Sequence, residues 1–255
     1  MNTVRLIFSP TGGTRRAADA LSADWISPNS SRRDCELSDP GTDLSSLPLS
    51  KSDLVLIALP SYGGRVPALA AERLAALRGN GAACVLLCTY GNRAYEDTLI
   101  ELADLAERSG LSVLAAVTAV TEHSIARCYA TGRPDEQDRQ ELRAFGQRIA
   151  ETLSARPTTT PALPGNRPYK ALSTRKLIPV PDESCNHCGL CAASCPVQAI
   201  DPETLHTDDA SCIGCMRCVS VCPQQARRPD PATLALLTEA LRPLCSDRKP
   251  NELFI

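Results

Sequence analysis

Apolar and polar positions alternate in blocks along the first 150 residues of the chain. Short apolar runs of the kind found in buried strands are each followed by a longer stretch. The longer stretches carry apolar residues three and four positions apart, which is typical of helices packed on one face. Strands are predicted at residues 4–8, 52–60, 82–90 and 111–120, with a weaker one at 33–37, and helices at 14–25, 67–79, 94–110 and 135–153.

This alternation predicts an α/β domain. Strands that alternate with helices form a parallel sheet covered on both faces. Ligands of such sheets bind outside the carboxyl ends of the strands. We therefore expect the chemistry of this domain in the loops after residues 8, 60 and 90.

The loop SPTGGT, which follows the first predicted strand, leads directly into a helix N-terminus. Its hydroxyls, its glycines and the positive end of the helix dipole favour an anion. Because the loop has no lysine, it lacks the signature of NTP hydrolases, and a monophosphate suits it better than a triphosphate. A simple helix cap is the alternative. The candidate residues are Ser9, Thr11, Gly12, Gly13 and Thr14.

Two further loops, PSYGGRVP and TYGNRAYED, contain three of the five tyrosines of the chain. Tyrosine faces suit a flat ring, and glycines let backbone groups reach its heteroatoms. Arg65 and Arg93 are placed at the rim of this region. The candidates are Pro60, Ser61, Tyr62, Gly63 and Gly64 in the first loop and Thr89, Tyr90, Gly91, Asn92 and Tyr95 in the second.

Residues 1–153 resemble a short-chain flavodoxin domain. SPTGGT is similar to the phosphate loop of that family, and PSYGGR and TYGNRAY are similar to its ring-binding loops. The resemblance implies FMN as the ligand, with its isoalloxazine between Tyr62 and Tyr90. It also implies a flavodoxin-like, doubly wound, five-stranded parallel sheet in the order 2-1-3-4-5.

The composition changes after residue 153. Residues 154–181 are rich in proline, serine and threonine and are predicted to form an extended connector. Beyond them the pattern C-x2-C-x2-C-x3-C-P occurs twice and holds eight of the 13 cysteines. Thiolates bind soft metals, and four of them complete the iron corners of a [4Fe–4S] cube. A zinc ribbon, built from pairs of C-x2-C, is the alternative.

From residue 182 to about residue 228 the chain resembles a bacterial two-[4Fe–4S] ferredoxin, a small α+β domain. In that family the fourth cysteine of each run ligates the other cluster. The resemblance therefore implies one cluster on Cys185, Cys188, Cys191 and Cys222, and a second on Cys212, Cys215, Cys218 and Cys195. No role is assigned to Cys35, Cys84, Cys88, Cys128 or Cys245.

The ferredoxin-like domain is predicted to span 182–230, with a helix and tail at 231–255. We expect the apolar end of the tail, residues 253–255, to lie between the two domains. We also expect the ferredoxin-like domain to lie over the sheet edge that carries Tyr62 and Tyr90, because electrons tunnel efficiently only over short distances.

The whole chain is similar to flavodoxin–ferredoxin fusion proteins, a family found mainly in anaerobic bacteria and archaea. A cluster carries one electron, whereas FMN accepts one or two. The resemblance thus implies an electron-transfer flavoprotein, a one-electron/two-electron converter for a redox protein partner. The alternatives are an FMN-dependent reductase of a small organic substrate, refilled by the clusters, and a redox sensor. Whether the chain is an enzyme or a carrier is left open.

Net charge and hydropathy limit the classes of partner that the protein is expected to bind. The net charge of −2 gives no basic excess for nucleic acid. No apolar run approaches the roughly 20 residues of a membrane span, and the N-terminal run is too short for a signal peptide. We therefore expect a cytoplasmic protein, in which cysteines serve as metal ligands rather than in disulfides. No G-x-G-x-x-G fingerprint is present, so direct oxidation of NAD(P)H is not expected.

Overall fold

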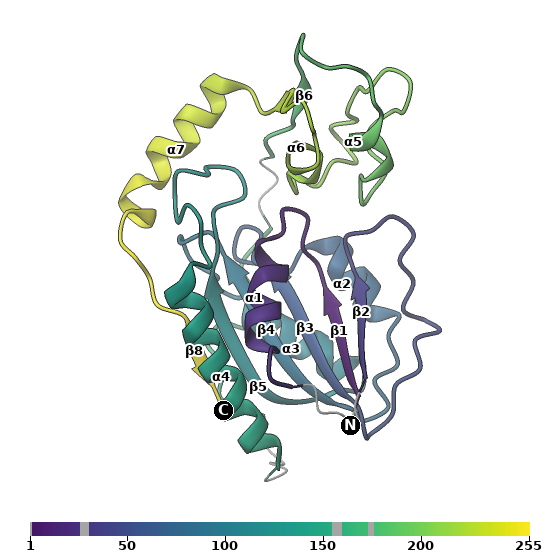
Figure 1. Cartoon of the computed structure of the whole chain (residues 1–255), viewed down its shortest axis with the longest axis vertical. Coiled ribbons are helices and arrows are strands. Elements are labelled where there is room, and N and C mark those ends of the chain that lie inside the picture. The colour runs from purple at the N-terminus through teal and green to yellow at the C-terminus, as the bar shows by residue number, and fades with distance from the viewer. Residues whose placement is uncertain (1, 26–30, 155–159, 173–175) are drawn as a thin grey trace.

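A six-stranded sheet forms the framework of the larger domain, as Figure 1 shows. The structure is a computed structural model, and it describes residues 2–25, 31–154, 160–172 and 176–255. The strand order is β2-β1-β3-β4-β5-β8, in which all neighbours are parallel except the last pair. The strands are β1 (Thr3–Ile7), β2 (Arg32–Glu36), β3 (Leu54–Pro60), β4 (Ala83–Tyr90), β5 (Ser112–Val120) and β8 (Glu252–Phe254).

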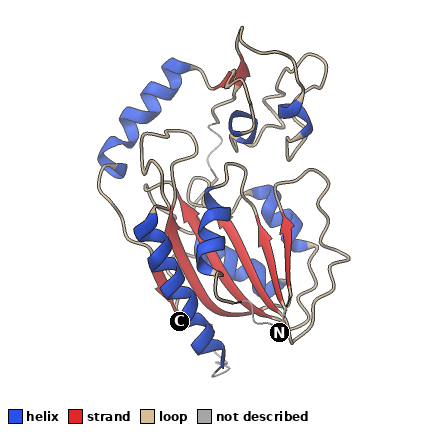
Figure 2. Ribbon diagram, in the orientation of Figure 1, coloured by secondary structure: helices blue, strands red, loops and turns tan. Residues whose placement is uncertain are grey.

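The first five strands confirm the predicted flavodoxin-like order 2-1-3-4-5. The central strands β3 and β4 are buried almost throughout because helices cover both faces of the sheet (Figure 2). α1 (Gly13–Leu21) and α4 (Glu136–Ser154) cover one face, whereas α2 (Ala68–Ala75) and α3 (Thr98–Arg108) cover the other. Two hydrophobic clusters, one on each side of the sheet, result from this layering.

The helix predicted at 94–110 begins later, at Thr98. Glu96 takes a left-handed conformation with φ of 44°, which a continuous helix does not allow. Its carboxylate lies against Gly64, where an added Cβ would be only 1.8 Å from Glu96 Oε2. The loop that follows β4 is therefore shaped by a contact across the sheet edge, which local periodicity does not report.

The connector is fixed to the larger domain over its described residues, 160–172 and 176–181. Arg167 forms an ion pair with Asp104 at 2.5 Å, and Lys170 pairs with Glu96 at 2.5 Å. No helix or strand occurs in the described part before β6, as expected for an extended segment. The ion pairs hold the connector along α3, so that it runs towards the carboxyl edge of the sheet.

The second domain contains four short elements above that edge (Figure 1). Its two-stranded sheet consists of β6 (Val180–Pro181) and β7 (Arg227–Arg228), which are antiparallel. Two single-turn helices, α5 (Leu190–Ala193) and α6 (Arg217–Ser220), each contain the third cysteine of a motif. The predicted position over the sheet edge is thus confirmed.

The C-terminal segment returns to the larger domain. α7 (Pro231–Cys245) starts with the Asp230 carboxylate accepting the Thr233 N–H at 2.8 Å and runs back towards the sheet. β8 then pairs with the outer edge of β5, with Phe254 opposite Ala116. The expectation that residues 253–255 lie between the domains was therefore wrong, because this segment satisfies its backbone as an edge strand. Among the described residues, no helix has both the length and the apolar character needed to cross a membrane.

Candidate metal centre and the adjoining sheet edge

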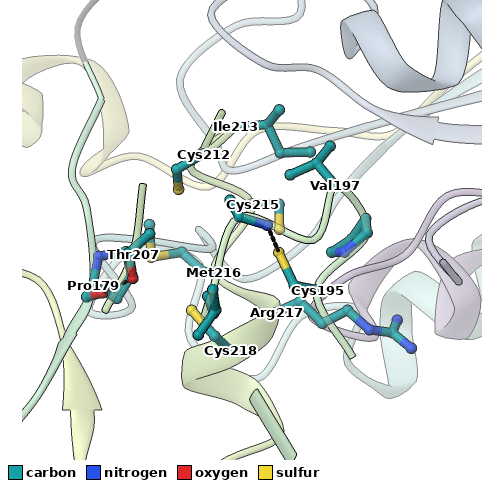
Figure 3. A pocket seen from close by; sticks show the side chains of 13 residues that line it. Pro179, Cys195, Val197, Thr207, Cys212, Ile213, Cys215, Met216, Arg217 and Cys218 are labelled. Atoms are coloured by element: carbon teal, nitrogen blue, oxygen red, sulfur yellow. Dashed lines mark hydrogen bonds between the residues drawn. The ribbon is translucent and has the colours of Figure 1, made fainter. Parts of the chain in front are cut away.

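The cysteines of the two motifs surround two cavities in the second domain. The first, which we call the inner cavity, has an empty volume of about 350 Å³ that includes its opening to solvent (Figure 3). Pro179, Ile213 and Met216 contribute to its wall. Its cysteines are Cys195 from the first motif and Cys212, Cys215 and Cys218 from the second.

The other cavity, which we call the outer cavity, has an empty volume of about 340 Å³ measured in the same way. It combines three cysteines of the first motif with one of the second: Cys185, Cys188, Cys191 and Cys222. The structure thus brings together each of the two predicted sets of four. That each set holds a cluster stays a prediction.

The two motifs fold alike because equivalent residues repeat every 27 positions. Gly189 precedes α5 with φ of 72°, and Met216 precedes α6 with φ of 61°. These left-handed residues turn the backbone around each cavity and allow N–H groups to approach sulfur. The Gly214 amide, for example, donates to Cys212 Sγ at 3.4 Å.

Burial makes the inner cavity unfavourable for a free thiolate. It raises the pKa of Cys215 to about 12 and the pKa of Cys218 to about 11. A thiolate at this depth is stable only beside compensating positive charge, so metal loading would release protons here. Within the described residues, no three His, Cys, Asp or Glu side chains are placed to share a single metal ion.

Comparison with known families decides the nature of the second domain. Residues 184–226 match the family model of the 4Fe-4S dicluster domain, and all eight motif cysteines lie within the match. This segment is a 4Fe-4S dicluster domain. No curated protein matches the chain.

Several solved structures are similar to about 60% of the chain. The Streptococcus pneumonia TIGR4 flavodoxin is 18% identical, with a TM-score of 0.45, over 59% of this chain and 99% of its own. A flavodoxin from the domain Archaea is 16% identical, with a TM-score of 0.42, over 60% and 99%. Rubredoxin oxygen:oxidoreductase from Desulfovibrio gigas is 18% identical, with a TM-score of 0.45, over 60% and 36%. The flavodoxin-like fold of the larger domain rests on its strand order rather than on these similarities.

The dicluster domain contacts the carboxyl edge of the sheet through its inner cavity. Arg217, next to Cys218, donates to Ser38 Oγ at 3.0 Å and to the Asp39 carboxylate at 2.7 Å. Ile213 packs on the same hydrophobic cluster as Tyr62. Burial raises the pKa of Tyr62 well above its usual range, and the charge of the Cys215 thiolate adds to this rise.

The loop after β1 fits an anion. Gly12 has φ of 84° and precedes α1, and no side chain caps this helix. In the described part of the chain, no hydrogen bond from the N–H groups of Gly13 or Thr14 is found. A Cβ on Gly12 would come within 3.4 Å of Arg16 Nη1, so a cation lies beside the open amides. These features together favour a bound phosphate group.

Three of the five predicted anion ligands have partners inside the chain. The Gly12 N–H donates to the Ser9 carbonyl at 3.3 Å. Ser9 Oγ accepts the Arg15 N–H at 3.0 Å, and the Ser9 N–H donates to Glu36 Oε1 at 3.2 Å. The Thr14 hydroxyl shares a 2.7 Å hydrogen bond with the Thr89 hydroxyl. The structure thus brings the first and third loops together, and it leaves the amides of Gly13 and Thr14 as the open groups.

The loop after β3 places Tyr62 at the centre of the sheet edge. The Tyr62 ring meets Phe8 edge to face, with centroids 6.2 Å apart. Arg65 does not lie free at the rim, because Glu101 holds its guanidinium with two hydrogen bonds of 2.7 Å. Arg93 is likewise paired, with Glu96 at 2.7 Å.

The loop after β4 holds the C-terminal tail. Asn92, only 3% exposed, donates to the Cys245 carbonyl at 2.7 Å and to the Asp247 carbonyl at 2.8 Å. Tyr90 is 5% exposed, and the Tyr95 hydroxyl donates to Glu252 Oε2 at 2.8 Å. The expected stacking face of Tyr90 is therefore covered by protein in this structure.

Three features of the site were missed by the sequence analysis: Arg217, Arg227 and the tail. The cysteine motifs identify only the candidate metal ligands. Arg217 and Arg227 line the same two cavities, but the motifs do not specify either residue. Comparison of the two repeats gives a signal for Arg227, because its counterpart 27 positions earlier is Ile200. No local signal gives the docking of the tail.

His123, which lies at this edge of the sheet, should make the stability of the larger domain depend on pH. It packs on Gly91, and its Nδ1 accepts the N–H groups of Ile125 and Ala126 at 3.2 and 3.1 Å. Burial, together with the charge of Arg93, lowers the pKa of His123 from 6.5 to about 4. The unfolded chain therefore binds the extra proton between these values, and the stability present above pH 6.5 is lost as the pH falls.

Between pH 7 and pH 5 this residue should lower the free energy of unfolding by up to about 2 kcal/mol, at about 1.36 kcal/mol per unit. Thermal midpoints followed by the fluorescence of Trp25, the single tryptophan, measure the effect. His123→Asn keeps an acceptor near Nδ1 without titrating, so its pH slope should be smaller. Equal slopes in both proteins would refute the assignment.

Proposed function

We propose that the protein is an electron-transfer flavoprotein that moves electrons between two [4Fe–4S] clusters and FMN on behalf of a redox partner. The observation that carries this proposal is the docking of the inner cavity on the carboxyl edge of the sheet, where Arg217 bonds to Ser38 and Asp39 and Ile213 packs on the same cluster as Tyr62. A dicluster domain already marks the chain as an electron-transfer redox protein.

The cysteine sets fit the two clusters. Each cavity offers four thiols from two motifs, which is the crossed arrangement of two-cluster ferredoxins. We assign Cys185, Cys188, Cys191 and Cys222 to the outer cluster and Cys195, Cys212, Cys215 and Cys218 to the inner one. In these positions the side chains bind iron, and the apolar walls exclude water.

The sheet edge fits the phosphate end of FMN. The open amides of Gly13 and Thr14, the left-handed Gly12 and the nearby Arg16 form a cradle for a doubly charged group. On the ring side, Tyr62 is partly buried and Gly63 is exposed, whereas Tyr90 and Asn92 hold the tail. We therefore assign the ring contact to the Tyr62 loop and the tail contact to the Tyr90 loop.

The two cavities differ in their access to solvent. Cys188 of the outer cavity is exposed, and the neighbouring Leu190 is 43% exposed. Cys215 of the inner cavity is 8% exposed, and Ile213 in the wall of the same cavity packs on the hydrophobic cluster of the sheet. When bound, the clusters supply one-electron and the flavin two-electron capacity. The chain thus presents its outer cavity to a redox partner and its inner cavity to the Tyr62 loop.

Anaerobic purification with iron, sulfide and FMN assays tests the cofactor content. The ligand count leads us to expect about eight irons and eight sulfides per chain, with one FMN. About two zinc ions per chain, without sulfide, would show that the cysteines bind zinc instead of iron–sulfur clusters. Full cluster content without FMN would remove the flavin part of the proposal and leave the dicluster part intact.

A further inference from the structure

Arg227 is a buried arginine in the wall of the outer cavity. It lies on β7, directly after the second cysteine motif, and it is 2% exposed. Its neighbour on the same strand, Arg228, is exposed and pairs with Asp182 at 2.8 Å. The two neighbouring arginines of β7 therefore differ. Arg228 faces solvent and pairs with a carboxylate, whereas Arg227 is buried in the cavity wall.

The guanidinium of Arg227 donates to wall residues of both cavities. Its Nη1 donates to Cys191 Sγ at 3.7 Å and to the Leu205 carbonyl at 3.1 Å, and Nη2 donates to Thr207 Oγ1. Cys191 belongs to the outer cavity, whereas Thr207 lines the inner one. One side chain thus bonds to a sulfur atom of the outer set and to a wall residue of the inner cavity.

This buried charge has no carboxylate counter-ion. Among the described residues, no Asp or Glu forms an ion pair with Arg227. Its Nε is buried and has no hydrogen-bond partner in the described part of the chain. An unpaired buried cation costs several kcal/mol. The neighbouring thiolate sets are the negative charge that would compensate it.

The internal repeat shows that packing does not require an arginine here. The segments CPVQAI and CPQQAR occupy equivalent positions, and Arg227 corresponds to Ile200, which is 5% exposed. The first repeat therefore fills this position with an apolar side chain. The second repeat places a full positive charge there, between the two cavities.

We infer that Arg227 is the shared counter-charge of the two clusters and raises the reduction potential of both. This inference rests on the proposed ligand sets but not on FMN. Each cluster gains one negative charge on reduction, and a fixed cation at short range in a poorly solvated site stabilises the reduced form. Because the guanidinium bonds to wall residues of both cavities, both potentials shift in the same direction when its charge is removed.

The test is an anaerobic redox titration of the full-length protein, followed by EPR, in wild type, Arg227→Gln and Arg228→Gln. For Arg227→Gln we expect the ratio of oxidised to reduced cluster at fixed potential to rise about tenfold or more at both clusters, which is about 59 mV for a one-electron couple. For Arg228→Gln, whose charge is exposed and screened, we expect less than about a twofold change. Both variants remove one positive charge, so net charge alone cannot produce the difference.

Arg227→Lys separates charge from folding. It keeps the charge, so its potentials should stay within about threefold of the wild-type equilibrium. If Arg227→Gln does not load iron, the Arg217→Gln variant, which keeps Arg227, is labelled with [guanidino-15N]arginine and its reduced state is measured by pulsed EPR. Nitrogen couplings from an arginine at both clusters support the inference.

Results that would refute the role of Arg227 differ from results that would refute the proposed function. Full iron and sulfide content with unchanged potentials in Arg227→Gln, or a shift at one cluster only, would overturn the role of Arg227 and leave the ligand sets intact. Absence of arginine nitrogen couplings in the labelled protein would overturn it as well. A wild-type protein without about eight irons would instead refute the ligand sets themselves.

Discussion

Replacing Cys215 by serine is expected to remove the inner cluster and to abolish rapid electron transfer between the dicluster domain and the flavin site. Cys215 is buried in the inner cavity, which docks on the sheet edge through Ile213 and Arg217. Iron should fall from about eight to about four per chain. Transfer to FMN within one molecule should slow strongly, because the remaining outer cluster does not lie at the contact between the domains.

Two matched variants control this result. Cys188→Ser removes an exposed ligand of the outer cavity, so it should also lose about four irons but keep transfer from the inner cluster. Cys128→Ser removes an exposed cysteine outside both motifs and should change neither iron content nor rate. If Cys188→Ser slows the internal transfer as much as Cys215→Ser, the inner cavity is not the one that faces the flavin.

Replacing Asn92 by alanine is expected to produce the largest loss of stability in the larger domain. Asn92 donates two buried hydrogen bonds to the tail and has φ of 64°. The lost hydrogen bonds cost about 1 kcal/mol each, and the left-handed conformation costs alanine about 1–2 kcal/mol more. A total of about 3–4 kcal/mol should lower the thermal midpoint by about 6–16 °C in a domain of this size. Trp25 fluorescence reports the transition in this domain.

Asn92→Gly and Asn80→Ala separate the two contributions. Glycine adopts the left-handed conformation freely, so Asn92→Gly should lose only the hydrogen-bond part, about 2 kcal/mol. Asn80 also has a positive φ, of 50°, but it is exposed and donates one hydrogen bond to Leu49. Midpoints of Asn92→Ala and Asn80→Ala that fall equally would show that backbone strain alone, and not the tail, explains the loss.

Much of the larger domain could be predicted from the sequence because its elements are local and repetitive. Each buried strand is a continuous apolar run, and parallel pairing with crossover helices leaves few possible orders. Even the weak strand at 33–37 forms one residue earlier, at Arg32–Glu36, because β1 offers it a complete edge. The cysteine spacing similarly groups the eight motif cysteines into two sets, which the structure brings together in two cavities.

The tail could not be placed because its partners are distant in sequence. Asn251 donates to Asp138, and Arg248 pairs with Asp135 and Asp138, more than 100 positions earlier. An apolar tripeptide at 253–255 indicates burial but not the surface that it covers. The same part of the tail explains why Tyr90 and Asn92, expected at the flavin ring, are instead buried against the segment that precedes β8.

The spacing of the cysteines also does not reveal which charged residues act on the two cavities. Arg217 and Arg227 are ordinary basic residues in the sequence, and their roles depend on the folding of two repeats against each other and against the sheet. The replacement of Ile200 by arginine in the second repeat is visible in the sequence, yet its meaning requires the knowledge that this position is 2% exposed.

The central claim is that redox centres in the two domains exchange electrons within one molecule across the contact between the inner cavity and the carboxyl edge of the sheet. Flash photoreduction of the anaerobic, fully loaded protein, followed at flavin and cluster wavelengths over a range of protein concentrations, tests it most directly. We predict a transfer phase between clusters and flavin whose rate constant is the same at every concentration. A rate that rises in proportion to protein concentration, or clusters and flavin that never equilibrate, would contradict the account.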